Sequence, residues 1–119
     1  MATNDASVQT QARLQALPKA RIEEFAQRIA REFHSERIIL FGSHARGNAG
    51  PDSDVDLLVL MPANGKTSHA QAAEIYLKCP SDFPVDILVR TPEEFERRLR
   101  MRDWFMRDIA QEGVTLYAA

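Results

Sequence analysis

The chain of 119 residues contains a single cysteine, Cys79. One cysteine cannot form an intramolecular disulfide, and it cannot supply a CxxC zinc site or a cysteine-based metal cluster. The sequence also lacks any apolar run near the ~20 residues that a membrane-spanning helix needs, and it does not begin with a basic segment followed by an apolar one. We therefore expect a cytoplasmic protein that does not enter a membrane.

An excess of charge of either sign is absent as well. The 15 basic and 17 acidic residues leave a formal charge of −2, which gives no overall field that would gather nucleic acid. We therefore expect no stable direct binding of RNA or DNA. The length fits one domain and leaves little room for a second substrate-binding lobe, so a large substrate would be met largely on the outer surface.

Helical and strand patterns alternate along most of the chain. Residues 1–16 are small and polar and predict a flexible or weakly helical arm, followed by a single domain over residues 17–119. The patterns predict helices over 18–33, 67–78, from Thr91 onward, and around 104–112, with strands over 37–41, 55–61, 84–90 and 114–117. This order predicts an α/β (α+β) fold, in which helices flank a small mixed sheet.

Two helix boundaries have specific local signals. Thr91 precedes Pro92 and stands three residues before Glu94, a pattern that satisfies the free amide hydrogens at a helix start. Gly113 follows the last helical pattern and is expected to end it in a left-handed conformation.

Three aspartates stand in or beside apolar strands. Asp54 and Asp56 are two residues apart at the start of one strand, so both side chains should share a face. Asp86 lies within another apolar strand, where an unpaired charge would be expensive to bury. If the two strands are neighbours, the carboxylates can converge on one hard cation such as Mg²⁺, which prefers oxygen ligands.

Each aspartate also has a simpler explanation on its own. Asp54 can be a turn residue and Asp56 an exposed edge residue, while Arg90 or Arg37 can neutralise Asp86. The combination of all three favours the cation site over these separate explanations.

Gly42 and Ser43 directly follow the first strand. Glycine lets the backbone approach a ligand closely, and serine can cap a helix and donate to phosphate, although an ordinary strand-to-helix turn explains the pair equally well. The segment contains neither GxxxxGK[ST] nor GxGxxG, so it is not a Walker loop or a dinucleotide-binding fingerprint. The three histidines, His34, His44 and His69, have no metal-ligand spacing, and we expect His44 to be a solvent-exposed loop residue.

The segment GSHARGNAGPDSDVD, with Gly-Ser, ten residues and then Asp-x-Asp, resembles the motif of the DNA polymerase β-like nucleotidyltransferase superfamily. Asp86 in PVDILV resembles that superfamily's third carboxylate. From about Ile22 to Tyr117 the chain is similar to the minimal nucleotidyltransferases that serve as antitoxins to HEPN-domain ribonucleases.

The resemblance implies a role for each motif residue. Gly42 and Ser43 would hold the triphosphate of ATP, and Asp54 and Asp56 would bind Mg²⁺. Asp86 would complete the metal site and help to activate the attacking hydroxyl. Arg46 either neutralises phosphate charge or is a plain surface residue.

The resemblance also implies an acceptor, a tyrosine of a HEPN toxin that receives AMP from ATP. Two alternatives stay open. The chain can be an antitoxin that neutralises its partner by occlusion without turnover, or an enzyme acting on a small molecule or an RNA end.

An apolar stripe near the end of the chain is formed by Met101, Trp104, Phe105 and Ile109. We expect it to pack into the core, with a surface for docking a partner as the second explanation.

Overall fold

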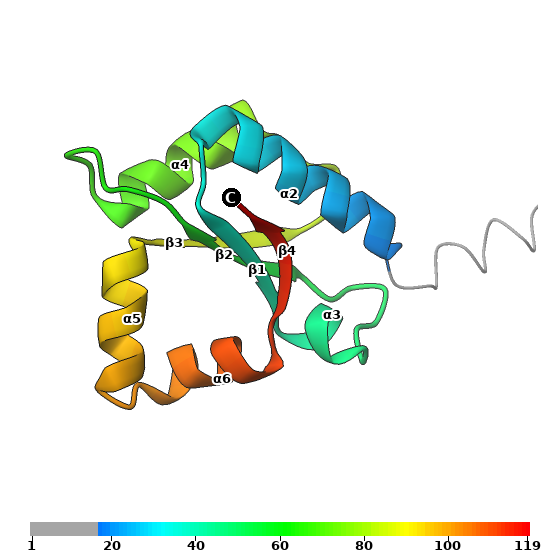
Figure 1. Ribbon diagram of the computed structural model, residues 1–119. Helices are drawn as coiled ribbons and strands as arrows, with labels where there is room; N and C mark the ends of the chain where they lie inside the picture. Colours follow the sequence, from blue (N-terminus) through cyan, green and yellow to red (C-terminus); the bar gives the residue numbers. More distant parts are fainter. Residues whose placement is uncertain (1–16) are drawn as a thin grey trace, which may run out of the picture.

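The computed structural model describes residues 17–119, so the predicted arm over residues 1–16 lies outside the described residues. The helices are α2 (Lys19–Phe33), α3 (Ser43–Arg46), α4 (Ser68–Lys78), α5 (Pro92–Arg100) and α6 (Trp104–Glu112). The strands are β1 (Arg37–Phe41), β2 (Val55–Leu60), β3 (Val85–Arg90) and β4 (Val114–Ala118) (Figure 1). The predicted α/β class and the predicted order of the longer elements are confirmed.

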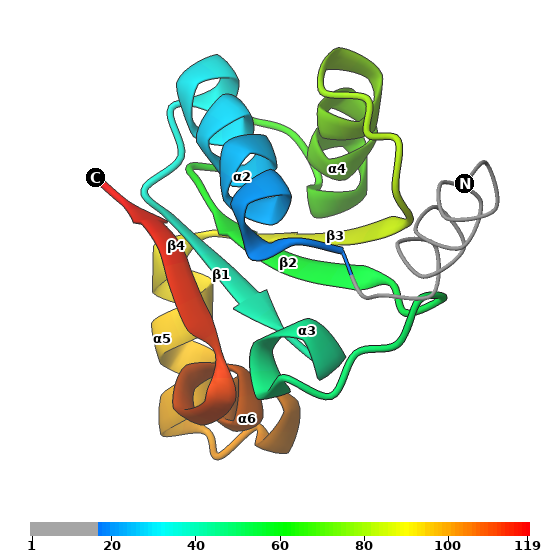
Figure 2. The same cartoon turned by 90° about the vertical axis from the view of Figure 1, so that its right-hand side faces the viewer.

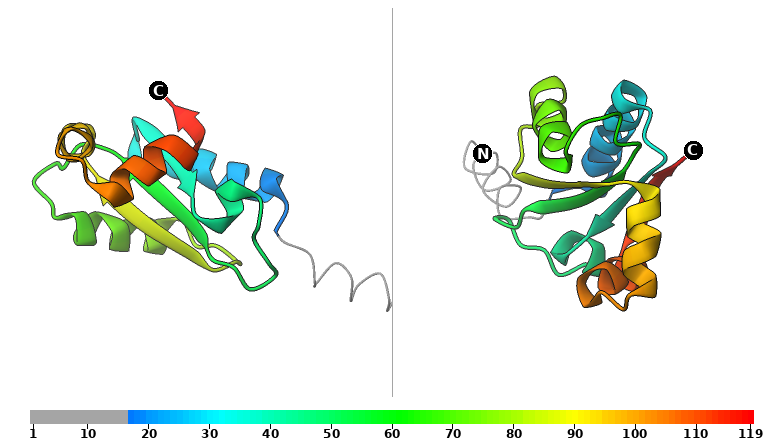
Figure 3. Two further views of the ribbon diagram at one scale, coloured as in Figure 1. Left: turned by 90° about the horizontal axis from the view of Figure 1, so that it is seen from below. Right: turned by 90° about the vertical axis from the view of Figure 1, so that its left-hand side faces the viewer.

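The four strands form one mixed sheet in the order β3-β2-β1-β4. Strand β1 runs antiparallel to both β2 and β4, while β2 and β3 are parallel and joined through α4. Helices α2 and α4 cover one face of the sheet, and α5 and α6 lie on the other (Figure 2). Two further views show the same division (Figure 3). None of the helices within residues 17–119 has the length and apolarity to cross a membrane.

The hydrophobic residues of the sheet divide between its two faces because side chains alternate along a strand. On β2, Val55, Leu57 and Val59 belong to the core beneath α2 and α4. Leu58 and Leu60 belong to a second core with residues of α5 and α6. Burial on both faces explains why β2 reads as a nearly continuous apolar run.

The predicted start of α5 is confirmed. The Thr91 hydroxyl oxygen accepts a hydrogen bond from the Glu94 amide at 3.1 Å, and Pro92 is the first helical residue. Asp103 caps α6 in the same way, since its carboxylate accepts from the Met106 amide at 3.1 Å. These caps satisfy amide hydrogens that have no partner within the helix.

The prediction for Gly113 is wrong in its conformation. Gly113 has φ −70° and ψ 155°, so α6 ends in an extended residue and not in a left-handed one. A side chain here would overlap Ile39 of β1 and the Ile109 carbonyl, and its Cβ would lie 3.2 Å from the Leu40 carbonyl oxygen. Close packing of the end of α6 on β1 is therefore the reason for glycine at this position.

The apolar stripe does not pack into the core as expected. Ile109 is 2% exposed, but Met101, Trp104 and Phe105 are 61%, 77% and 52% exposed. Met101 lies in the turn between α5 and α6, so the helical period that joined it to the later residues is interrupted. Within α6 the buried residues are Met106 and Ile109, three positions apart.

Candidate active site

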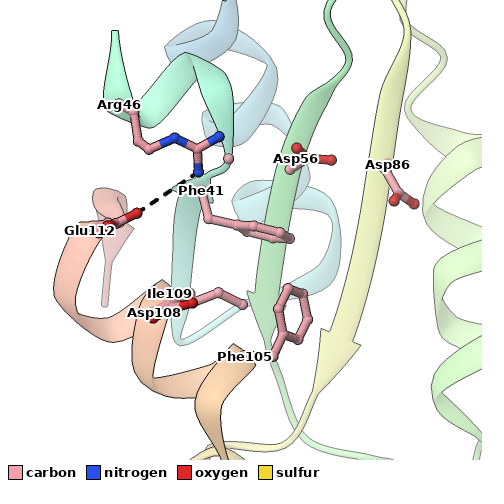
Figure 4. A pocket seen from close by; sticks show the side chains of 9 residues that line it. Phe41, Arg46, Asp56, Asp86, Phe105, Asp108, Ile109 and Glu112 are labelled. Atoms are coloured by element: carbon pink, nitrogen blue, oxygen red, sulfur yellow. Dashed lines mark ion pairs between the residues drawn. The ribbon is translucent and has the colours of Figure 1, made fainter. Parts of the chain in front are cut away.

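Asp56 and Asp86 occupy paired positions on two adjacent strands. They are direct partners in the parallel register of β2 and β3, and both line one cavity on the α6 side of the sheet (Figure 4). Their place follows from strand alternation, because Leu58 and Leu88 on the same face contact the core beneath α5 and α6. Two acidic residues therefore lie side by side at paired positions of neighbouring strands.

The environment of Asp56 opposes its ionisation. Burial raises the pKa of Asp56 above its ordinary value, and the negative charges of Asp86 and Asp54 raise that pKa further. His44 and Arg46 act in the opposite direction and lower it. A bound cation would relieve both the repulsion between carboxylates and the lost hydration of Asp56.

The backbone at the end of β1 lies directly against the Asp56 carboxylate. Gly42 has φ +75°, and a Cβ at this position would overlap Asp56 Oδ2 and lie 3.2 Å from Asp56 Cγ. Both the positive φ and the close approach require glycine. Ser43 follows as the first residue of α3, and the Gly42 carbonyl accepts from the Arg46 amide at 3.1 Å.

The cavity has a volume of about 460 Å³, a common size for a small-molecule pocket. Its lining comes from the sheet, α3 and α6 and consists of Phe41, Gly42, Arg46, Asp56, Asp86, Phe105, Asp108, Ile109 and Glu112. Arg46 Nη1 lies 3.8 Å from Glu112 Oε2, and both side chains are about half exposed. Acidic groups and one guanidinium thus share the cavity with two aromatic rings (Figure 4).

The structure brings four of the six predicted site residues into this cavity: Gly42, Arg46, Asp56 and Asp86. Ser43 is adjacent to Gly42 at the start of α3. Asp54 is exposed, lies just before β2 and is not part of the lining, although its charge acts on Asp56. Within residues 17–119 no group of three His, Cys, Asp or Glu side chains is placed ready to hold a metal ion. The metal-binding roles of the three aspartates therefore stay a prediction.

Two of the separate explanations for the aspartates do not hold. Asp56 lies on an inner strand of the sheet and is half-buried, so it is not an exposed edge residue. Neither proposed arginine pairs with Asp86, because Arg90 donates to the Val89 carbonyl at 2.6 Å and Arg37 donates to the Thr115 hydroxyl at 3.3 Å.

The expected burial of Asp86 is also wrong. The residue is exposed, because β3 is an edge strand of the sheet and Asp86 lies near the start of that strand. The prediction for His44 needs a similar correction, since its ring is half-buried and its Nε2 lies 3.3 Å from the Ser53 carbonyl oxygen.

Sequence reasoning did not place the α6 residues in the site. Phe105, Asp108, Ile109 and Glu112 all line the cavity. Their spacing of three, four and seven residues is that of one helix face, a signal that mixed apolar and acidic residue types obscured. For Phe41 the sequence pattern predicts only the last residue of an apolar strand.

The sequence is similar to known proteins over most of its length. The family model described as a nucleotidyltransferase domain matches residues 22–117. A Methanocaldococcus jannaschii protein, provisionally named a protein adenylyltransferase, is 30% identical over 101 residues, which cover 81% of this chain and 94% of that protein.

Two solved structures have a similar fold. A Sulfolobus solfataricus protein, provisionally named a nucleotidyltransferase, has a TM-score of 0.58 at 20% identity and covers 82% of this chain and 77% of its own. A chain from a toxin-antitoxin structure with AMP-PNP has a TM-score of 0.54 at 21% identity, covering 82% of this chain and 73% of its own. The family match and the archaeal relative show that this chain belongs to the nucleotidyltransferase domain family and is a nucleotidyltransferase.

Proposed function

We propose that this nucleotidyltransferase is a cytoplasmic antitoxin that transfers AMP from ATP to a tyrosine of a cognate HEPN ribonuclease toxin. The observation that carries the proposal is the in-register pair Asp56 and Asp86 beside the close backbone approach of Gly42. The name of the archaeal relative supports a protein as acceptor. The toxin-antitoxin neighbour supports a toxin as that protein, and its AMP-PNP supports an adenine nucleotide.

The carboxylates fit Mg²⁺ as the cofactor. Asp56 and Asp86 present hard oxygen donors at one height of the sheet, and Asp54 stands two residues before Asp56, near enough for its charge to act on that carboxylate. Mg²⁺ typically takes a few carboxylates and completes its shell with water and phosphate oxygens, so a ready cage of protein ligands is not needed. When bound, Mg²⁺ would lower the pKa of the acceptor hydroxyl and stabilise charge on pyrophosphate.

The remaining groups orient the triphosphate and the acceptor. Gly42 lets phosphate oxygens approach the backbone, and Ser43 donates its hydroxyl to them. Arg46 turns from Glu112 to phosphate, since a half-exposed ion pair contributes only ~0–1 kcal/mol and is easily exchanged.

The transfer is a single displacement at phosphorus. The tyrosine oxygen forms a bond to the α-phosphorus, and the bond from that phosphorus to the bridging oxygen breaks. Pyrophosphate leaves with the bonding electron pair, and Asp86 accepts the tyrosine proton.

Occlusion without turnover is the second candidate, and the exposed side chains of Met101 and Trp104 favour it. Apolar groups of this size on a surface are typical of protein contacts. Changing Asp54 and Asp56 to Asn separates the two functions. Lost protection with retained toxin binding supports catalysis, whereas full protection supports occlusion.

The direct test combines the protein, labelled ATP, Mg²⁺ and the product of the neighbouring gene. Intact-mass measurement should show a gain of AMP on that partner, and a tyrosine-to-phenylalanine change at the modified position should abolish it. If the partner gains no mass and the label appears on a small molecule or an RNA end, the acceptor is not a toxin tyrosine.

A further inference from the structure

One end of the cavity is aromatic and open. The Phe105 ring is 52% exposed and packs edge-to-face on Phe41, with 5.7 Å between ring centroids. Ile109 lies beside them and is buried. The two rings lie between α6 and β2 (Figure 4). An exposed ring that is held by a fixed neighbour gives a bound ligand an apolar surface that is already in place.

The other part of the same cavity is polar. It contains Asp56 and Asp86, the Gly42 backbone and the Arg46 guanidinium, and α6 adds the carboxyl groups of Asp108 and Glu112. A nucleoside triphosphate has the same division, because its phosphates are charged and bind metal while its base is a flat aromatic ring. The volume of about 460 Å³ is within the range of pockets that hold ligands of this class.

We propose that Phe105 is the wall on which the base of the bound nucleotide packs. The inference rests on the proposed function, because it places the nucleoside part of ATP in the cavity whose polar end takes the triphosphate. Phe41 acts as a positioning residue that fixes the Phe105 ring. The cavity then takes a nucleoside triphosphate in preference to a sugar triphosphate that lacks a base.

Trp104 provides a matched control on the neighbouring position of α6. It is an aromatic residue with 77% exposure, but it does not line the cavity. Its ring packs instead against Arg107, whose guanidinium carbon lies 5.6 Å from the ring centroid. Removing Trp104 therefore takes a similar apolar group from the same helix without touching the proposed wall.

The test measures the affinity of the full chain for two ligands by calorimetry in the presence of Mg²⁺. ATP has the base, and ribose 5-triphosphate has the same sugar and phosphates without it. Phe105→Ala should weaken ATP binding at least about fivefold, the lower end of what one stacked base contributes. The same variant should bind ribose 5-triphosphate within about twofold of the wild type, a difference well below 1 kcal/mol. Trp104→Ala should bind both ligands as the wild type does, and Phe105→Tyr, which keeps the ring, should restore ATP binding.

Two results would overturn the inference alone. One is unchanged ATP binding by Phe105→Ala, and the other is an equal loss for both ligands, which would indicate a general disturbance of the cavity. In either case the wild type still binds ATP, and the proposed transfer reaction stands. Wild-type protein that binds neither ligand with Mg²⁺ would overturn the proposed function and the inference together.

Discussion

Arg46 at the end of α3 and Glu112 at the end of α6 form an ion pair across the cavity, with 3.8 Å between Nη1 and Oε2. Among the residues of 17–119 that line the cavity, Arg46 is the only basic one. Glu112 ends its helix, where a negative charge interacts unfavourably with the helix dipole unless a cation is near. The pair therefore keeps a guanidinium at the cavity without binding it tightly.

This pair predicts opposite effects of two substitutions on nucleotide affinity. Glu112→Gln should strengthen ATP binding by up to about fivefold, because a competing carboxylate is removed from Arg46. Arg46→Ala should weaken ATP binding, because a positive charge next to phosphate is lost. Calorimetric titration of both variants and of the double variant checks the explanation. A Glu112→Gln effect that persists in the Arg46→Ala background would show that the two side chains act independently.

Gly42→Ala is predicted to reduce both stability and nucleotide binding. The new methyl group would meet the Asp56 carboxylate. The backbone of residue 42 has φ +75° and ψ −155°, a conformation that is nearly restricted to glycine and costs about 1–3 kcal/mol for another residue. Gly47→Ala is the control for a positive φ without a close contact, because Gly47 has φ +80° and ψ 16°, in the left-handed helical region, and nothing within 4 Å of an added Cβ.

Thermal unfolding and ATP titration separate the two contributions at Gly42. Both variants should lose stability, but only Gly42→Ala should lose ATP affinity. If the two variants lose stability and ATP affinity equally, the close contact between the Gly42 backbone and Asp56 does not contribute to nucleotide binding.

Asp56→Asn is predicted to stabilise the fold at neutral pH while it abolishes transfer. The folded-state pKa of Asp56 is raised above its ordinary value of 3.8 by burial and by neighbouring carboxylates. A raised pKa means that the folded state favours the protonated form of Asp56. The protonated side chain therefore stabilises the fold below pH 3.8, and this stabilisation is lost as the pH rises through the folded-state pKa. The wild type should therefore unfold at a lower temperature than Asp56→Asn at pH 7, and the difference should vanish near pH 3.

The control for this prediction is Asp52→Asn, an exposed aspartate in the turn just before β2 that does not line the cavity. Mg²⁺ should raise the unfolding temperature of the wild type and of this control more than that of Asp56→Asn. If Mg²⁺ raises the unfolding temperature of all three proteins equally, Asp56 does not bind the metal.

Thr91→Ala is predicted to destabilise the fold by ~1 kcal/mol, because the Glu94 amide loses the hydroxyl that accepts its hydrogen bond. Thr91→Ser keeps the hydroxyl and should stay close to the wild type. Urea unfolding with nucleotide titration provides the measurement, and ATP affinity should not change because Thr91 lies outside the cavity. A Ser variant as unstable as the Ala variant would attribute the loss to the methyl group.

The residues that the sheet and the turn after β1 contribute to the cavity could be proposed from the sequence, because their placement follows local rules. Gly42 follows an apolar strand, and alternation places Asp56 and Asp86 on one face once their strands are neighbours. The alignment of Asp56 with Asp86 depends on the pairing of β2 with β3. The sequence does not show that these two strands are neighbours.

The α6 side of the cavity could not be predicted in the same way. Whether Phe105 lines a pocket or joins the core depends on how α6 lies over the sheet, and that position is set by contacts distant in the sequence. Met106 and Ile109 bury against Leu58 and Leu60, which leaves Phe105 and Trp104 outside the core. The same tertiary packing places Gly113 against β1, and this close contact, not a left-handed cap, explains the glycine.

The direct passage from α6 into β4 has a mechanical consequence. Strand β4 pairs with β1, and β1 leads directly into Gly42 and the turn that follows. The helix that carries the aromatic wall and the segment expected to hold phosphate are therefore attached to the same pair of strands. Both walls of the cavity are therefore anchored to one ladder of backbone hydrogen bonds between β1 and β4, although they are far apart in the sequence.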